Sequence, residues 1–219
     1  MDPTQNPQPE PPLFEQPSAP AEGDFLAPPE ESKQSLGSHI VEFFQTLVVF
    51  AAIASAIYLF IAQPHRVSGL SMFPNFHNGD YIITDKLTYK LGEPKRGDIV
   101  VFKNPRDEGQ DFIKRIMGLP GDRVEVRDGH IYLNDVLVKE PYLKPEIYTN
   151  PGSYLQEGQS KTVTEGHYLV MGDNRGNSSD SREWGEITKA EIIGKVFVRY
   201  WPQDSIGLYP ATYSFENQK

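Results

Sequence analysis

The hydrophobic and polar positions divide the chain into three stretches. Residues 1–38 hold few apolar side chains and nine of the 19 prolines. Residues 39–64 are apolar almost throughout, and no Asp, Glu, Lys or Arg occurs from Phe43 to Pro64. Residues 65–219 contain short runs of β-branched and aromatic residues between clusters of Gly, Pro, Asn and Asp. This pattern predicts a tail, one long apolar helix and a β-rich domain.

The tail at residues 1–38 carries seven acidic residues and a single base, Lys33. A segment with so few apolar side chains and so many prolines cannot offset its loss of chain entropy by burying surface, so we expect it to be disordered. A proline-rich segment that docks onto a partner is the functional alternative.

The apolar stretch at residues 39–64 is long enough to cross a membrane. The 22 uncharged residues from Phe43 to Pro64 span about 33 Å as a helix, against a hydrocarbon core of roughly 30 Å. A buried core helix and a cleaved targeting signal are the alternatives, but an acidic, proline-rich segment precedes the run where a signal has a short basic region. We therefore predict one transmembrane helix. With Lys33 on one side and Arg66 on the other, charge leaves its orientation open.

Turn signals and alternating apolar residues predict the strands of the third stretch. Asp128-Gly129 and Asn134-Asp135 predict two consecutive hairpins over residues 123–140. A short helix is predicted around residues 189–193. Further strands are predicted at residues 81–89, 98–103, 166–173 and 195–202.

Composition excludes several kinds of site. A formal net charge of −9 and a pI near 5.1 argue against a general electrostatic grip on nucleic acid, so no nucleic-acid partner is predicted. The absence of cysteine excludes disulfides, a thiol nucleophile and thiolate zinc sites. No metal or other cofactor is predicted, because the histidines share no pattern typical of ligands or of a catalytic triad; they are His39, His65, His77, His130 and His167.

Four segments combine loop residues with reactive or charged side chains: VSGLSMFP at 67–74, RGDIVVF at 96–102, FIKRIMGLPGD at 112–122 and GDNRGNSSDSREWG at 172–185. In the first, Gly69 and Pro74 can present Ser71 on a rigid turn, although most loop serines are simply solvated. In the second, Asp98 is expected to bond nearby backbone amides rather than to act in catalysis. The fourth can lock its shape through charge-assisted hydrogen bonds or form an ordinary solvated turn.

Lys114 is the candidate base of the third segment. Strand alternation places it on the same face as Phe112 and Ile116. A surface lysine whose stem covers apolar residues is one interpretation. The functional interpretation requires burial, because only a desolvated amine has a pKa low enough to be neutral near pH 7.

In this order and after an apolar helix, the four segments resemble the motifs of type I signal peptidases. The resemblance runs from about residue 40 to Pro202, and the third and fourth motifs are the most specific. It implies that Ser71 is the nucleophile, Lys114 the general base and Ser178 the hydroxyl that orients the lysine. It also implies that four charged residues brace the fourth motif: Asp173, Arg175, Asp180 and Arg182.

The resemblance further implies an oxyanion hole in which the Ser71 backbone N–H is the main donor. Some members of the family carry a hydroxyl residue two places before the nucleophile, where this chain has Gly69, so Gly69 is predicted at the oxyanion hole together with Ser71. A second donor, for which the Ser68 hydroxyl is a candidate, stays open. Pockets for small substrate side chains are expected next to the nucleophile, and the candidate lining residues are Met72, Phe73 and Ile113.

The fold implied is the mostly-β fold that signal peptidases share with self-cleaving LexA-like repressor proteases, with a short β insertion at about residues 123–165. The implied activity is removal of signal peptides from exported preproteins after an Ala-x-Ala-like sequence. A single-pass anchor in the lipid bilayer is implied, with the N-terminus cytoplasmic and the catalytic domain on the trans side.

Three other functions remain alternatives. A non-catalytic anchored β domain that captures exported chains would bind without turnover, and Ser71 would lie too far from Lys114 for proton transfer. A self-cleaving regulator would need a DNA-binding helix-turn-helix, which residues 1–38 do not offer. A processing peptidase with a narrower set of clients, such as pilus or conjugation proteins, would use the same two residues.

Overall fold

The computed structural model describes residues 36–209, so the predicted tail lies almost entirely outside the described residues. Helix α1 (Leu36–Phe60) contains the segment Gly37–Phe60, which by length and composition could cross a membrane. The helix ends at Phe60 rather than at residue 64. Pro64 disfavours helical angles at the residue before it, and Ala62–Arg66 instead form strand β1.

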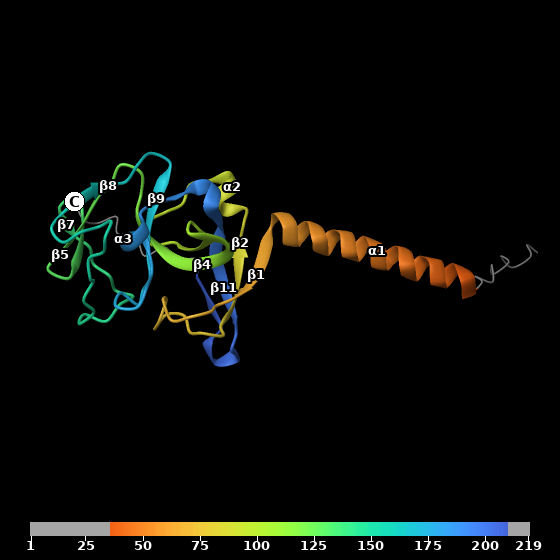
Figure 1. Cartoon of the computed structure of the whole chain (residues 1–219). Helices are drawn as coiled ribbons and strands as arrows, with labels where there is room; N and C mark the ends of the chain where they lie inside the picture. The colour runs from red at the N-terminus through yellow and green to blue at the C-terminus, as the bar shows by residue number, and fades with distance from the viewer. Residues whose placement is uncertain (1–35, 210–219) are drawn as a thin grey trace, which may run out of the picture. The chain divides into compact units, whose positions relative to one another are not determined.

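The larger of two sheets is antiparallel and begins with β1 as an edge strand. Its strands lie in the order β1-β2-β11-β3-β4-β9-β10, and β12 pairs with β11. Figure 1 shows β1, β2 and β11 on one side of the β domain and β5, β7 and β8 on the other. The remaining bounds are β2 (Tyr81–Asp85), β3 (Ile99–Asn104), β4 (Asp107–Gly118), β9 (His167–Met171), β10 (Ile187–Thr188), β11 (Ile192–Trp201) and β12 (Gly207–Leu208).

The smaller sheet lies within the predicted insertion and confirms both hairpins. Its order is β7-β6-β5-β8, with β5 (Arg123–Arg127), β6 (His130–Leu133), β7 (Val136–Leu137) and β8 (Ser160–Thr162). Asp128, Gly129, Asn134 and Asp135 all have positive φ, as two-residue hairpin turns require.

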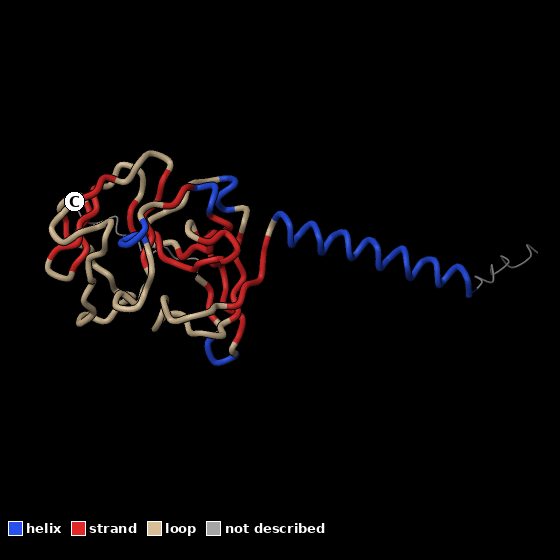
Figure 2. The backbone as a smooth tube through the Cα atoms, viewed as in Figure 1, coloured by secondary structure: helices blue, strands red, loops and turns tan. Residues whose placement is uncertain are grey.

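Helix is confined to short turns in the β domain (Figure 2): α2 (Thr88–Leu91), α3 (Ser181–Trp184), η1 (Lys189–Glu191) and η2 (Gln203–Ser205). The strand predicted at residues 81–89 ends at Asp85, because the Asp85 carboxylate accepts hydrogen bonds from the Leu87 and Thr88 amides and starts α2. The short helix predicted at 189–193 is a 3₁₀ turn with a Thr188–Glu191 capping box, and Ile192 already belongs to β11.

The larger sheet is buried on both faces at its centre. Ile99 and Val101 of β3 pack into one apolar cluster, whereas Val100 and Phe102 pack into another. Alternation therefore explains why β3 is an uninterrupted apolar run. In the neighbouring β4, residues 113–118 are buried as well, and they include the catalytic candidate on that strand.

Candidate active site

Ser71 lies on a tight turn between β1 and β2. The turn is closed by a hydrogen bond from the Phe73 amide to the Leu70 carbonyl, and Met72 anchors it by inserting into the core. Gly69 has a φ of +95°, a conformation that other residues resist. Its N–H donates to Asn78 Oδ1 over 3.0 Å, so the Ser71 N–H remains the candidate for the oxyanion donor.

Lys114 reaches Ser71 from β4. Its Nζ lies 2.9 Å from Ser71 Oγ and donates to the Ile113 carbonyl oxygen over 2.9 Å. The side chain is only 3% exposed, and its Nζ lies 4.8 Å from the centre of the Phe112 ring. An amine and a hydroxyl at this distance can exchange a proton directly.

Burial lowers the pKa of Lys114 to about 8, although the Asp180 and Asp173 carboxylates act in the opposite direction. A desolvated ammonium loses hydration that the neutral amine does not need. A substantial share of the Lys114 side chains is therefore neutral in mildly alkaline solution, as a general base requires.

Two buried ion pairs brace the loop that follows β9. Asp173 accepts two hydrogen bonds from Arg115, at 2.8 and 2.7 Å. The Asp180 carboxylate accepts from Arg182 and from the Gly172 amide. Burial alone would raise the pKa of Asp180, but the Arg182 guanidinium outweighs it and the pKa is lowered. The Asp180 carboxylate therefore stays ionised, and the two ion pairs hold the loop in one shape.

Gly172 brings this loop into contact with the nucleophile. A Cβ placed on Gly172 would overlap Ser178 Oγ and the Ser71 carbonyl oxygen. The Asn174 amide donates to that same carbonyl over 2.9 Å. Only glycine fits this approach, and the sequence motif alone did not single it out.

Ser178 is placed at this contact, but it forms no hydrogen bond to Lys114. Its hydroxyl is buried, makes no close hydrogen bond among residues 36–209, and helps to lower the pKa of the nearby Asp180 carboxylate. Its position against Gly172 keeps it beside the Ser71 backbone.

Arg175 connects the loop to the segment that follows β7. Its guanidinium is 2% exposed and donates to the Glu140 carboxylate, Tyr142 Oη and Thr149 Oγ1. Its Nε donates to the Gly172 carbonyl over 3.0 Å. We call Glu140, Tyr142 and Arg175 the clamp.

Asn75 joins the clamp to the nucleophile turn. Its Nδ2 donates to the Tyr142 carbonyl over 3.1 Å and to Asp173 Oδ2 over 2.8 Å. Sequence reasoning gave no role to Asn75, Arg115 or Glu140, because their partners are far away in the chain.

A cavity of about 260 Å³ opens over the pair. Of the three candidate lining residues, Ile113 lines this cavity. Met72 is buried in the core and Phe73 is 45% exposed beside His77, and neither lines it. Within residues 36–209, no three His, Asp or Glu side chains are placed to hold a metal ion. The lining comprises residues 65–71, Ile82, Val101, residues 111–114, Asn177 and Ser179.

Comparison with known proteins places this site in a family. Residues 40–201 match the family described as signal peptidase, peptidase S26. The chain is 38% identical over 188 residues to a probable signal peptidase I-2 of Synechocystis sp., covering 83% of this chain and 79% of the relative. It is 34% identical to signal peptidase I of Leptolyngbya laminosa (83% and 89% covered) and 33% identical to signal peptidase IB of Staphylococcus aureus (74% and 90% covered). The chain therefore belongs to the signal peptidase family, peptidase S26.

Proposed function

We propose that this chain is a membrane-anchored serine endopeptidase that removes signal peptides from exported preproteins, with Ser71 as nucleophile and Lys114 as general base. The observation that carries the proposal is the 2.9 Å separation of Ser71 Oγ from the buried Nζ of Lys114. The non-catalytic alternative required a separation too long for proton transfer, and this distance disfavours it.

In this mechanism the neutral Lys114 amine takes the proton of Ser71 Oγ as the oxygen attacks the scissile carbonyl carbon. The negative charge on the carbonyl oxygen is stabilised by the Ser71 N–H, with the Ser68 hydroxyl in the same cavity as the candidate second donor. The Lys114 ammonium then protonates the leaving amine. A water molecule, deprotonated by Lys114 in turn, hydrolyses the acyl-enzyme ester.

Ser178 has a positioning role in this proposal. When Lys114 gains a proton, its ammonium needs more acceptors than the Ile113 carbonyl and the Ser71 ester oxygen supply. The buried Ser178 hydroxyl makes no close hydrogen bond among the described residues, and its oxygen is a suitable acceptor after a small movement of either side chain.

The substrate class follows from the cavity and from α1. Apolar walls from Val67, Ile82 and Ile113 suit small aliphatic side chains before the scissile bond. The apolar helix would hold the site in the bilayer that also holds the substrate's hydrophobic segment. We place the N-terminus in the cytoplasm and the β domain on the trans side, with no nucleic-acid partner for a chain of net charge −9.

The test is cleavage of a preprotein with an Ala-x-Ala site, in detergent, by the full chain. Ser71→Ala and Lys114→Met should each lower kcat by about 10³-fold or more, since nucleophile and base act as a unit. Ser160→Ala and Lys144→Met, both at exposed positions, are the matched controls and should retain activity. Cleavage at the wild-type rate by either active-site variant would contradict the proposal.

A further inference from the structure

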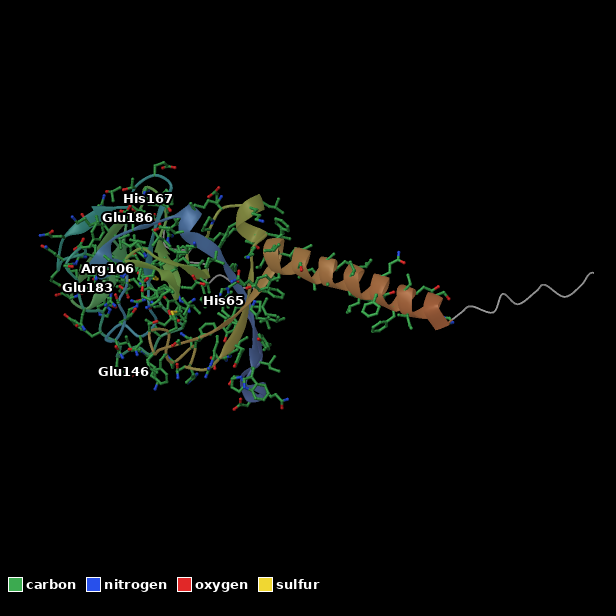
Figure 3. The ribbon with its side chains drawn as sticks, turned by 45° about the vertical axis from the view of Figure 1, so that its right-hand side comes forward. His65, Arg106, Glu146, His167, Glu183 and Glu186 are labelled. Carbon is green, nitrogen blue, oxygen red and sulfur yellow. The ribbon has the colours of Figure 1, made fainter. Side chains whose placement is uncertain are left out.

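The cavity that holds Ser71 and Lys114 contains a second polar pair, His65 and Asp111. His65 lies on β1 (Figure 3), and Asp111 lies on β4, three residues before Lys114. The His65 side chain is 12% exposed and that of Asp111 is 39% exposed. The pair therefore borders the space that a bound peptide would occupy, and the mechanism above makes no use of it.

The hydrogen bonds of Thr84 determine which nitrogen of His65 carries the proton. The Thr84 hydroxyl donates its single proton to the Gln63 carbonyl over 3.1 Å. With its proton given to this carbonyl, Thr84 Oγ1 accepts from His65, whose Nε2 lies 3.1 Å away. The neutral imidazole then has its proton on Nε2 and a lone pair on Nδ1.

This tautomer leaves two acceptors facing each other. His65 Nδ1 lies 3.8 Å from Asp111 Oδ2, which is too long for a hydrogen bond. Burial lowers the pKa of His65, the Asp111 carboxylate raises it and the Lys86 charge lowers it. The net effect is a lowered pKa, so the ring is neutral at pH 7. A donor group between Nδ1 and the carboxylate would satisfy both acceptors.

We propose that His65 and Asp111 form a specificity subsite that accepts a lysine ammonium of the preprotein, in the segment before the scissile bond. The inference rests on the proposed function and names a feature of its substrate. A cation suits the subsite better than a neutral donor, because the Asp111 carboxylate has no hydrogen-bonded cation among the described residues. An aliphatic side chain would leave both acceptors without a donor.

Other charged groups around the subsite are compatible with this choice. Arg66 lines the cavity, but its guanidinium lies over the Tyr81 ring at 5.8 Å. Lys86 acts on His65 from the end of β2, and its Nζ donates to backbone carbonyls of residues 58 and 59. Lys114 is the base and is neutral when it acts.

The test compares peptides that differ at one residue, using the full chain in detergent. A reference peptide carries alanine before the cleavage site, and lysine or methionine is placed at each successive position upstream. Methionine matches the unbranched shape of lysine without its charge. At one position, kcat/KM for the lysine peptide should exceed that for the methionine peptide by about fivefold, the effect of a partly exposed charged hydrogen bond.

Asp111→Asn should bring this ratio close to unity, and Asp107→Asn is the matched control, on the same strand but outside the cavity lining. Because the ratio is taken within one enzyme, it does not depend on the amount of folded protein. A wild-type ratio at or below unity at every position, or a ratio unchanged by Asp111→Asn, would overturn the subsite and leave cleavage of the reference peptide intact. Failure to cleave even the reference peptide would overturn the proposed function as well.

Discussion

A lysine serves as a base only while its amine is unprotonated. In Lys114, burial rather than a neighbouring cation favours the unprotonated amine. Its amine contacts a hydroxyl, a backbone carbonyl and the face of an aromatic ring. None of these groups carries a full positive charge, so desolvation is the main cause of the lowered pKa. The activity should therefore depend on pH through this one group.

With a pKa of about 8 for Lys114, kcat/KM should rise with pH and reach half its plateau near that value. Protonation removes the base, so below the pKa the rate should fall about tenfold per pH unit. The measurement is a pH–rate profile on a soluble peptide, with circular dichroism at each pH to confirm that the fold persists. A profile that is flat through this range, or that falls with increasing pH, would count against Lys114 as the base.

At the scale of elements, the segment after β7 holds two active-site loops together. Glu140 and Tyr142 bind Arg175, and Asn75 bonds to the Tyr142 carbonyl. Burial disfavours the Arg175 charge, but the Glu140 carboxylate outweighs this and raises its pKa. The β insertion is therefore part of the support of the catalytic site.

Glu140→Gln should weaken the clamp without changing its shape. The buried Arg175 guanidinium would lose the opposite charge of its partner, and we expect the free energy of unfolding to fall by about 2 kcal/mol. Removing the Glu140 side chain altogether would cost more, because glutamine still accepts a hydrogen bond from Arg175. We expect kcat to fall more than KM rises, since Arg175 holds the backbone of Gly172, which packs against Ser71. Urea unfolding and steady-state kinetics check both effects.

The control for this variant is Glu146→Gln, an exposed position in the same segment that Figure 3 shows at the periphery of the domain. It makes the same change of charge and should alter neither the stability to urea nor kcat. Equal stability and equal kcat in Glu140→Gln and Glu146→Gln would show that the clamp does not support the site.

Local signals predicted the elements better than the contacts between them. The hairpins at Asp128-Gly129 and Asn134-Asp135 depend on adjacent residues only, and their left-handed turns were predictable. The start of β1 was missed, because an apolar run does not show where a helix gives way to a strand. Alternation placed Lys114 on the face of Phe112, but it could not show what covers that face.

At the scale of the whole molecule, the sequence likewise predicted the residues of the site better than the contacts between them. The motif resemblance assigned Ser71 and Lys114 their roles, and the fold brings them within 2.9 Å. Nothing in the sequence links Asn75 to Tyr142 or Glu140 to Arg175, since these pairs form only when the two sheets are assembled. His65 had no pattern with other histidines, and the groups that its ring faces, Thr84 and Asp111, lie on two other strands.

The proposed anchor has its own consequence for catalysis. As an anchor, the apolar helix Gly37–Phe60 would restrict the enzyme to the plane of the bilayer, where a membrane-bound preprotein would meet it in two dimensions. Removing residues 1–60 should therefore lower the cleavage rate of a preprotein in vesicles by about 10²-fold. On a soluble peptide in detergent, kcat/KM should stay within about twofold of the value for the full chain. The reason is that every described contact of Ser71 and Lys114 lies beyond residue 60.

The two assays together separate tethering from damage to the domain. A loss of equal size on the vesicle substrate and on the soluble peptide would mean that the truncation harms the fold, and the tethering argument would then fail. Replacing residues 36–60 by an unrelated apolar helix of the same length is the decisive comparison. If the helix serves only to concentrate enzyme and substrate in one plane, the replacement should restore cleavage in vesicles, because concentration depends on membrane insertion and not on the particular side chains of α1.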